Sequence, residues 1–151
     1  MFKMAILGLL VLGVSPLLAE ADPNMSDMTE YYTKMMAFEK DFIDLGKYSQ
    51  GVSDKTAANG LTDVASEYSR EIDHLRDLLF ILTIIDNNDD RSLVIPVVAA
   101  SMKYVAGSID ISLEKINLEM SHARSNAIIS TGNQMKTVLR QLQKLLAEQA
   151  K

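Results

Sequence analysis

The sequence predicts an all-α protein, an elongated antiparallel bundle of three long helices with a fourth that is either shorter or continuous with the third. Apolar residues recur at alternating intervals of three and four over most of the chain, which is the period of one helix face. Proline is absent from residues 24–95 and again after Pro96, and no segment shows the sustained apolar–polar alternation of a strand. We therefore expect helices throughout.

The N-terminal segment has the pattern of a secretory signal peptide. Lys3 supplies an early positive charge, residues 5–14 form an apolar run, and Ala19 and Ala21 place small side chains before a cleavage site. The run is shorter than the ~20 residues needed to cross a bilayer, and Pro16 follows it. We expect cleavage after Ala21, no transmembrane anchor in the mature chain, and an exported protein that is periplasmic or extracellular.

Residues 1–21 are thus expected to be a signal-peptide helix, and residues 22–151 a single α-helical bundle domain. The chain has no cysteine, which excludes disulfides, thiolate zinc sites and Cys–His nucleophiles. Its net charge is −5 and its basic residues are scattered, so neither nucleic acid nor an anionic membrane surface is expected as a partner. No glycine-rich phosphate loop is present. We expect that the protein is not an enzyme.

The first helix is expected from about Ser26 to Tyr48, with Gly46 and Gly51 bracketing its end. Its apolar seam, with a seven-residue repeat, consists of Met28, Tyr31, Met35, Phe38, Phe42 and Leu45. Methionine is frequent along the predicted seams of the chain, and we expect it to fill the core rather than to bind copper or haem.

The second helix is expected to reach Asp86 and to begin at Thr62 or as early as Ser53, because Gly60 leaves both starts open. Its seam consists of Ala65, Tyr68, Ile72, Leu75, Leu79 and Leu82. Residues 78–85 are apolar on every side, which is typical of a helix that is fully buried or meets a partner. A buried strand is the alternative for this short run, but the helical spacing enters it unbroken and favours a helix.

A polar turn at residues 86–90 precedes the third helix. It lacks the central glycine and the distal glutamate of a calcium loop, so we expect Asp89 or Asp90 to lie near a helix N-terminus. The third helix is expected to begin between Leu93 and Pro96, because proline fits best in a first turn. Its seam consists of Ala99, Met102, Ala106, Ile109, Leu113, Ile116, Met120, Ala123 and Ala127.

The apolar seam then shifts by one residue. The new seam consists of Ile128, Met135, Val138, Leu142 and Leu145. The shift falls near Thr131 and Gln134, which have the spacing of a capping box. We expect a new helix to start there, and a continuous kinked helix is the alternative.

Two Glu-x-x-His segments form the candidate metal site. Glu71 and His74 lie on the second helix, Glu119 and His122 on the third, and Glu39 on the first. In this respect the pattern is similar to the ferritin-like carboxylate proteins, which bind two iron or manganese ions inside a four-helix bundle. At 100° per residue, however, the two histidines lie about 130° and 140° from the centres of their seams. We therefore assign no metal, cofactor or catalytic residue, and a metal-binding four-helix protein is the alternative function.

Binding to another protein is the function that the sequence favours. The apolar residues 78–85 and 93–98 flank one turn and so gather at one end of the bundle, where an exposed patch would form an interface. Cover by the first and last helices is the alternative. We expect an inhibitor or immunity-type protein, a chaperone-like factor or a component of a surface assembly, whose partner is another protein or a second copy. Binding of a lipid or a small apolar molecule at the same end is a further alternative.

Overall fold

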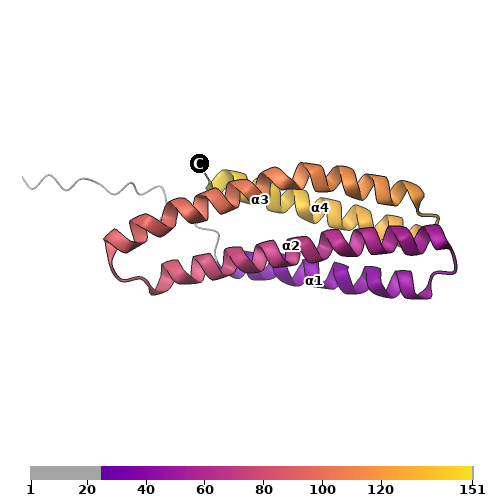
Figure 1. Ribbon diagram of the computed structural model, residues 1–151, viewed down its shortest axis with the longest axis horizontal. Coiled ribbons are helices and arrows are strands. Elements are labelled where there is room, and N and C mark those ends of the chain that lie inside the picture. Colours follow the sequence, from indigo (N-terminus) through magenta and orange to yellow (C-terminus); the bar gives the residue numbers. More distant parts are fainter. Residues whose placement is uncertain (1–24, 151) are drawn as a thin grey trace, which may run out of the picture.

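Four α-helices account for nearly all of the described chain (Figure 1). The computed structural model describes residues 25–150, so the predicted signal peptide lies outside the described residues. The helices are α1 (Met25–Tyr48), α2 (Val52–Ile84), α3 (Asn88–His122) and α4 (Asn126–Gln149). Consecutive helices pack antiparallel, and α1 also contacts α4, which closes the bundle. The prediction of an all-α antiparallel bundle is confirmed, and the fourth helix is separate from the third.

The core follows most of the seams that the sequence predicts; the exception is the end of the third seam, where Ala123 lies in a turn and Ala127 is exposed on α4. In α1, Met28, Met35 and Phe42 are fully buried, and every predicted seam residue of α2 is buried. Met102 of α3 and Met135 of α4 are buried as well, so these methionines fill the core as expected. The apolar run at the end of α2 is helical as far as Ile84, and the strand alternative is wrong.

The start of α3 differs from the prediction. The helix begins at Asn88, and Pro96 lies inside it rather than in its first turn. The side chain of Asn87 accepts a hydrogen bond of 3.0 Å from the backbone N–H of Asp89, which caps the helix in the usual way. Asp89 and Asp90 occupy the first turn, where their charges suit the helix dipole, as predicted. This cap starts the helix before the proline. Because Pro96 has no N–H, the carbonyl of Ser92 lacks its usual helical hydrogen bond, and Ser92 is exposed to water.

The boundary between α3 and α4 also differs from the prediction. The chain turns at residues 123–125, and Thr131 and Gln134 lie inside α4, so the predicted capping box is wrong. Gly132 belongs to the buried face of α4 together with Ile128 and Met135, at intervals of four and three. The side chain of Met120 occupies the space beside Gly132. The change of seam therefore marks the turn itself and not a break within the last helix.

The two central helices of the chain are longer than the outer two. The helices α2 and α3 have 33 and 35 residues, whereas α1 and α4 have 24 each. The difference is roughly 15 Å at 1.5 Å per residue. Because the α1–α2 and α3–α4 turns lie at the same end, the extra length projects at the other end. Figure 1 shows the α2–α3 turn well beyond the first turn of α1 and the last turn of α4.

Candidate interaction surface

The projecting part of α2 and α3, residues 78–98, is called the hairpin end below. Leu79, Leu82 and Val98 of these two segments are buried. Several large apolar side chains on the same segments are nevertheless exposed; their exposed fractions are 51% for Phe80, 38% for Ile81, 60% for Ile84, 72% for Leu93 and 50% for Val97. The prediction that these two apolar segments gather at one end is confirmed. Within residues 25–150 the first and last helices leave this surface uncovered, so the alternative of complete cover is wrong.

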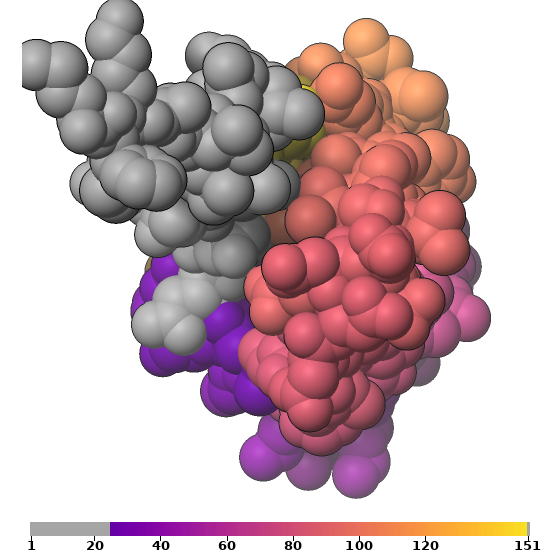
Figure 2. Space-filling model, turned by 90° about the vertical axis from the view of Figure 1, so that its left-hand side faces the viewer, coloured from indigo at the N-terminus to yellow at the C-terminus, as the bar shows by residue number. Residues whose placement is uncertain are grey.

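The tip of the hairpin end is polar and acidic. Asp86, Asp89 and Asp90 are exposed around the turn, and Arg91 is half-buried beside them. In Figure 2 the hairpin end faces the viewer, with α2 and α3 standing in front of α1. These three aspartates, called the acidic rim below, border the apolar segments at the tip, and a polar border is common at protein interfaces. An anionic membrane surface would be repelled by the same carboxylates.

The residues of the candidate metal site do not come together. Glu39, Glu71 and Glu119 are half-buried, and His74 and His122 are exposed, as their angular positions predict. No group of three possible metal ligands occurs among the described residues, 25–150.

The position of Glu119 explains why the two Glu-x-x-His segments lie apart. Its side chain covers Gly60 of α2, where a Cβ would collide with the carboxyl group. Glu71 is eleven residues further along α2, which corresponds to roughly 16 Å at 1.5 Å per residue. A site for two metal ions needs its ligands at one level of the bundle, and these two segments lie at different levels.

Gly60 does not interrupt α2. The Glu119 side chain of α3 lies beside it, and the glycine leaves room for that side chain. The helix therefore runs unbroken from Val52, close to the earlier of the two predicted starts.

A second exposed apolar feature, which the sequence analysis missed, runs along α3. We call it the outer seam; its residues are Leu93, Val97, Ala100, Tyr104, Gly107, Ile111, Glu114 and Leu118, and all are exposed. They recur at intervals of four and three, so the signal is present in the sequence. The outer seam is hard to recognise in the sequence because the buried seam of the same helix repeats at the same intervals.

The helix α3 has a further property that follows from its two apolar faces. Among the described residues it is the one helix long and apolar enough to cross a membrane, and only 28% of its apolar stretch is buried. A helix of this length and apolar composition in the core of a soluble protein is ordinarily mostly buried. The low burial here shows that much of the apolar surface of α3 lies outside the bundle core.

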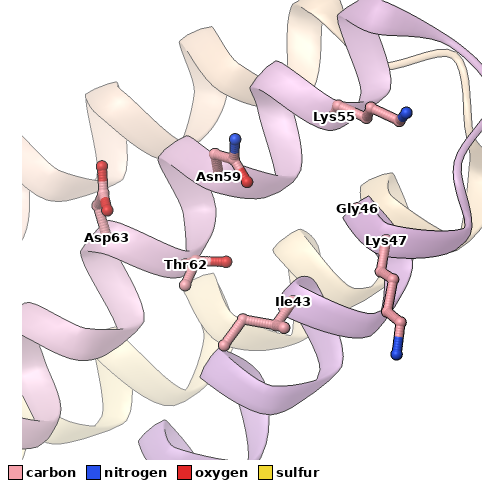
Figure 3. A pocket seen from close by; sticks show the side chains of 7 residues that line it. All are labelled: Ile43, Gly46, Lys47, Lys55, Asn59, Thr62 and Asp63. Atoms are coloured by element: carbon pink, nitrogen blue, oxygen red, sulfur yellow. The ribbon is translucent and has the colours of Figure 1, made fainter.

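The groove between α1 and α2, with a volume of about 600 Å³, is a weaker candidate (Figure 3). It forms where Gly46 allows close approach to Ala58, since a Cβ at residue 46 would lie 3.0 Å from the Cβ of Ala58. Figure 3 shows that Lys47 and Lys55, from its two sides, extend away from each other. The groove is open, and its lining includes both positive and negative side chains. Its polar groups therefore do not converge on a single ligand position.

The opposite end of the bundle carries a polar contact between distant parts of the chain. The Oδ1 atom of Asp54, near the start of α2, accepts hydrogen bonds from the backbone N–H groups of Arg124 (2.6 Å) and Ser125 (3.0 Å). These bonds hold the pKa of Asp54 below its ordinary value. Asp54 thereby caps α4, whose own N-cap residue, Ser125, makes no side-chain cap. The two hydrogen bonds thus join the start of α2 to the turn between α3 and α4.

The buried hydroxyl groups of the core form another closed network. The hydroxyl of Tyr68 donates to Oγ of Ser112 at 3.1 Å and lies 3.0 Å from Oγ of Ser108. Burial raises the pKa of Tyr68, while the two serine hydroxyls act in the opposite direction. The tyrosine is fully buried, so this network joins α2 to α3 and offers no access to a ligand.

Comparison with known proteins gives no match: no protein-family model, curated protein or solved structure is detectably similar to this chain.

Proposed function

We propose that this protein is an exported helical bundle that acts by binding another protein through its hairpin end. The observation that carries the proposal is the exposure of Phe80, Ile84, Leu93 and Val97 on a segment that projects beyond the rest of the bundle. Exposing large apolar side chains to water is unfavourable by about 25 cal/mol for each Å². A partner that covers them recovers this free energy, which is the usual origin of affinity at such patches.

The acidic rim indicates the chemistry of the partner. A surface that fits the hairpin end would be apolar at its centre and basic at the position facing Asp86, Asp89 and Asp90. An inhibitor or immunity-type protein, a chaperone-like factor and a component of a surface assembly all work through such an interface. The metal-binding alternative gains no support, because its ligands lie at different levels of the bundle.

Site-specific photo-crosslinking in the native envelope tests the proposal. A photoreactive residue at position 80 should give one discrete crosslinked protein, whereas the same residue at position 43 should not. Ile43 is the matched control, because it is 51% exposed, as is Phe80, but lies on α1. The crosslinked protein, once purified, should bind the chain directly, and Phe80→Asp should weaken that binding by about tenfold or more.

Two results would overturn the proposal. Equal crosslinking from positions 80 and 43 would show that the hairpin end has no particular role. Crosslinking of position 80 to lipid alone, together with binding of the purified chain to neutral vesicles, would show that the apolar surface serves a membrane.

A further inference from the structure

Within residues 25–150, no other helix covers the outer seam of α3. Its eight residues are exposed, whereas Met102, Ile109 and Ile116 on the opposite face of the same helix are buried in the core. The alternating intervals of four and three persist from Leu93 to Leu118, about three and a half heptads. A period of 3.5 residues matches a second α-helix packed along the first, because each side chain can then enter a gap on the partner. The seam therefore fits a helix better than it fits a lipid surface or a small ligand.

Gly107 supplies an independent observation. Each of the other helical glycines has an internal reason: a Cβ at Gly46, Gly60 or Gly132 would press on a neighbour at 3.0 Å or less. A Cβ at Gly107 would meet nothing within 4 Å. Glycine in a helix interior is unfavourable relative to alanine, so no contact within residues 25–150 accounts for glycine at this position, whereas close approach of a partner helix would.

Large and small side chains alternate in the middle of the outer seam, from Val97 to Ile111. Val97, Tyr104, Ile111 and Leu118 recur at intervals of seven, and the small residues Ala100 and Gly107 lie between them. The seam thus has two alternating sets of positions. In an antiparallel pair of identical helices, each position of one set faces a position of the other set on the second helix. If the two-fold axis passes between residues 105 and 106, Tyr104 faces Gly107 of the second copy, Ile111 faces its Ala100, and Leu93 faces its Leu118. The fourth pair in this register is Val97 with the Glu114 of the second copy, where the exposed carboxylate lies at the edge of the contact.

The charges beside the seam favour the same arrangement. Lys103 and Asp110 are exposed on one flank of the seam, and neither forms an ion pair within residues 25–150. In the antiparallel arrangement, Lys103 lies beside Asp110 of the second copy, and this contact occurs twice. A parallel arrangement would instead place Glu114 against the same residue of the second copy, which is repulsive.

We propose that the protein forms a homodimer in which the outer seam of α3 pairs antiparallel with the outer seam of a second copy. The two-fold axis passes beside Val105 and Ala106, and Tyr104 packs over the Gly107 of its partner. This pairing uses Leu93 and Val97, which also belong to the hairpin end, but leaves Phe80, Ile81 and Ile84 of α2 for another protein. The homodimer is thus a second interaction, and its test can fail without the failure of the proposed function.

Sedimentation velocity of the purified protein over a range of concentrations tests the dimer. We expect a reversible monomer–dimer equilibrium, with Ile111→Asp weakening association by about tenfold or more. The matched control is Ile43→Asp, which places the same charge at an exposed isoleucine of α1 and should leave association unchanged. Phe80→Asp should also leave it unchanged. A wild-type chain that stays monomeric at all concentrations, or equal effects of Ile111→Asp and Ile43→Asp, would overturn the proposal.

A charge exchange tests the arrangement without altering apolar surface. Lys103→Asp and Asp110→Lys should each weaken the dimer by about fivefold, because each creates two like-charge contacts. The double variant restores opposite charges and should recover the association of the wild type. Because both residues are exposed, folding is unaffected, and circular dichroism serves as the check. Additive weakening in the double variant would contradict the antiparallel register.

A distance measurement distinguishes the two orientations. Since the chain has no cysteine, Lys115→Cys gives one spin label for each copy. In the antiparallel dimer, residue 115 faces residue 96 of the partner, so the two labelled positions lie 19 residues apart, roughly 29 Å along the axis at 1.5 Å per residue. In a parallel dimer they would lie side by side. A single distance well below roughly 20 Å would overturn the antiparallel proposal.

Discussion

The carboxylate of Asp54 accepts a hydrogen bond of 2.6 Å from the backbone N–H of Arg124, a residue 70 positions further along the chain. The same oxygen accepts from Ser125. A single side chain at the start of α2 therefore fixes the turn that joins α3 to α4. The bond ties the two halves of the bundle together at the end opposite the hairpin end.

The pH dependence of stability should report this contact. The pKa of Asp54 is lower in the folded protein than in the unfolded chain, so its contribution to stability is complete above the unfolded value of about 3.9. It is lost as the pH falls through that value towards the folded pKa. Asp54→Asn keeps an oxygen acceptor but removes the charge, so it should destabilise the protein at pH 7, and its effect should shrink as the pH is lowered from about 4 through the folded pKa of Asp54. Urea unfolding over a series of pH values from 7 downwards measures this, and an effect that does not change with pH would contradict the assignment.

The buried pair Tyr68 and Ser112 should show direct coupling. Tyr68→Phe removes the donated hydrogen bond and should lower the free energy of unfolding by about 1 kcal/mol. Ser112→Ala removes the acceptor, and the double variant should be less damaging than the sum of the two single variants by about 1 kcal/mol. Chemical denaturation of the four proteins gives the coupling free energy. Strict additivity would show that the hydroxyl groups do not stabilise each other.

The helical glycines should respond in opposite directions to alanine. At Gly132, a Cβ would press against Met120, so Gly132→Ala should destabilise the bundle by about 1 kcal/mol despite the better helix propensity of alanine. At Gly107 there is open space, so Gly107→Ala should stabilise the monomer by up to about 1 kcal/mol. Thermal unfolding at a concentration where the chain is monomeric compares the two. Destabilisation by both variants would show that Gly107 has an internal role.

Replacing Pro96 should stabilise the isolated protein. Proline inside a helix leaves the carbonyl four residues earlier without its donor, and Pro96→Ala restores that donor at an exposed position. We expect the free energy of unfolding to rise by about 1–3 kcal/mol. Urea denaturation of Pro96→Ala measures the change, with Ala100→Gly as a control that should destabilise the same helix. No gain from Pro96→Ala would mean that the helix already bends so as to accommodate the proline.

The sequence predicts the interior of this fold well because burial imposes a period. Leu75 and Leu79 of α2 lie on the same buried face as the seam residues that begin at Ala65. A change in this spacing would expose apolar side chains, so the spacing is kept along the helix. The boundaries are less predictable because they depend on contacts between distant residues. The turn before α4 depends on Asp54, and no local pattern around Arg124 reveals that contact.

The candidate surface was predicted in part. Residues 78–85 and 93–98 were expected at one end because they flank a single turn, and the unequal helix lengths then decide that this end projects. The outer seam was missed because a search for one buried seam treats the exposed apolar residues, such as Tyr104 and Ile111, as isolated surface residues. The Glu-x-x-His motif fixes the relation of two residues on one helix. It does not fix how α2 and α3 are aligned, and the alignment places Glu71 and Glu119 at different levels of the bundle.

The unequal helix lengths also have a kinetic consequence. Leu61 and Tyr68 of α2 are fully buried, whereas Phe80 and Ile84 are exposed on the part of α2 that, within residues 25–150, extends with α3 beyond α1 and α4 (Figure 1). Local opening requires less free energy where fewer apolar contacts must be broken. Amide hydrogens should therefore exchange progressively faster along α2 towards Ile84. The hairpin end is thus able to adjust the spacing of its two helices when a partner binds, while the rest of the bundle stays closed.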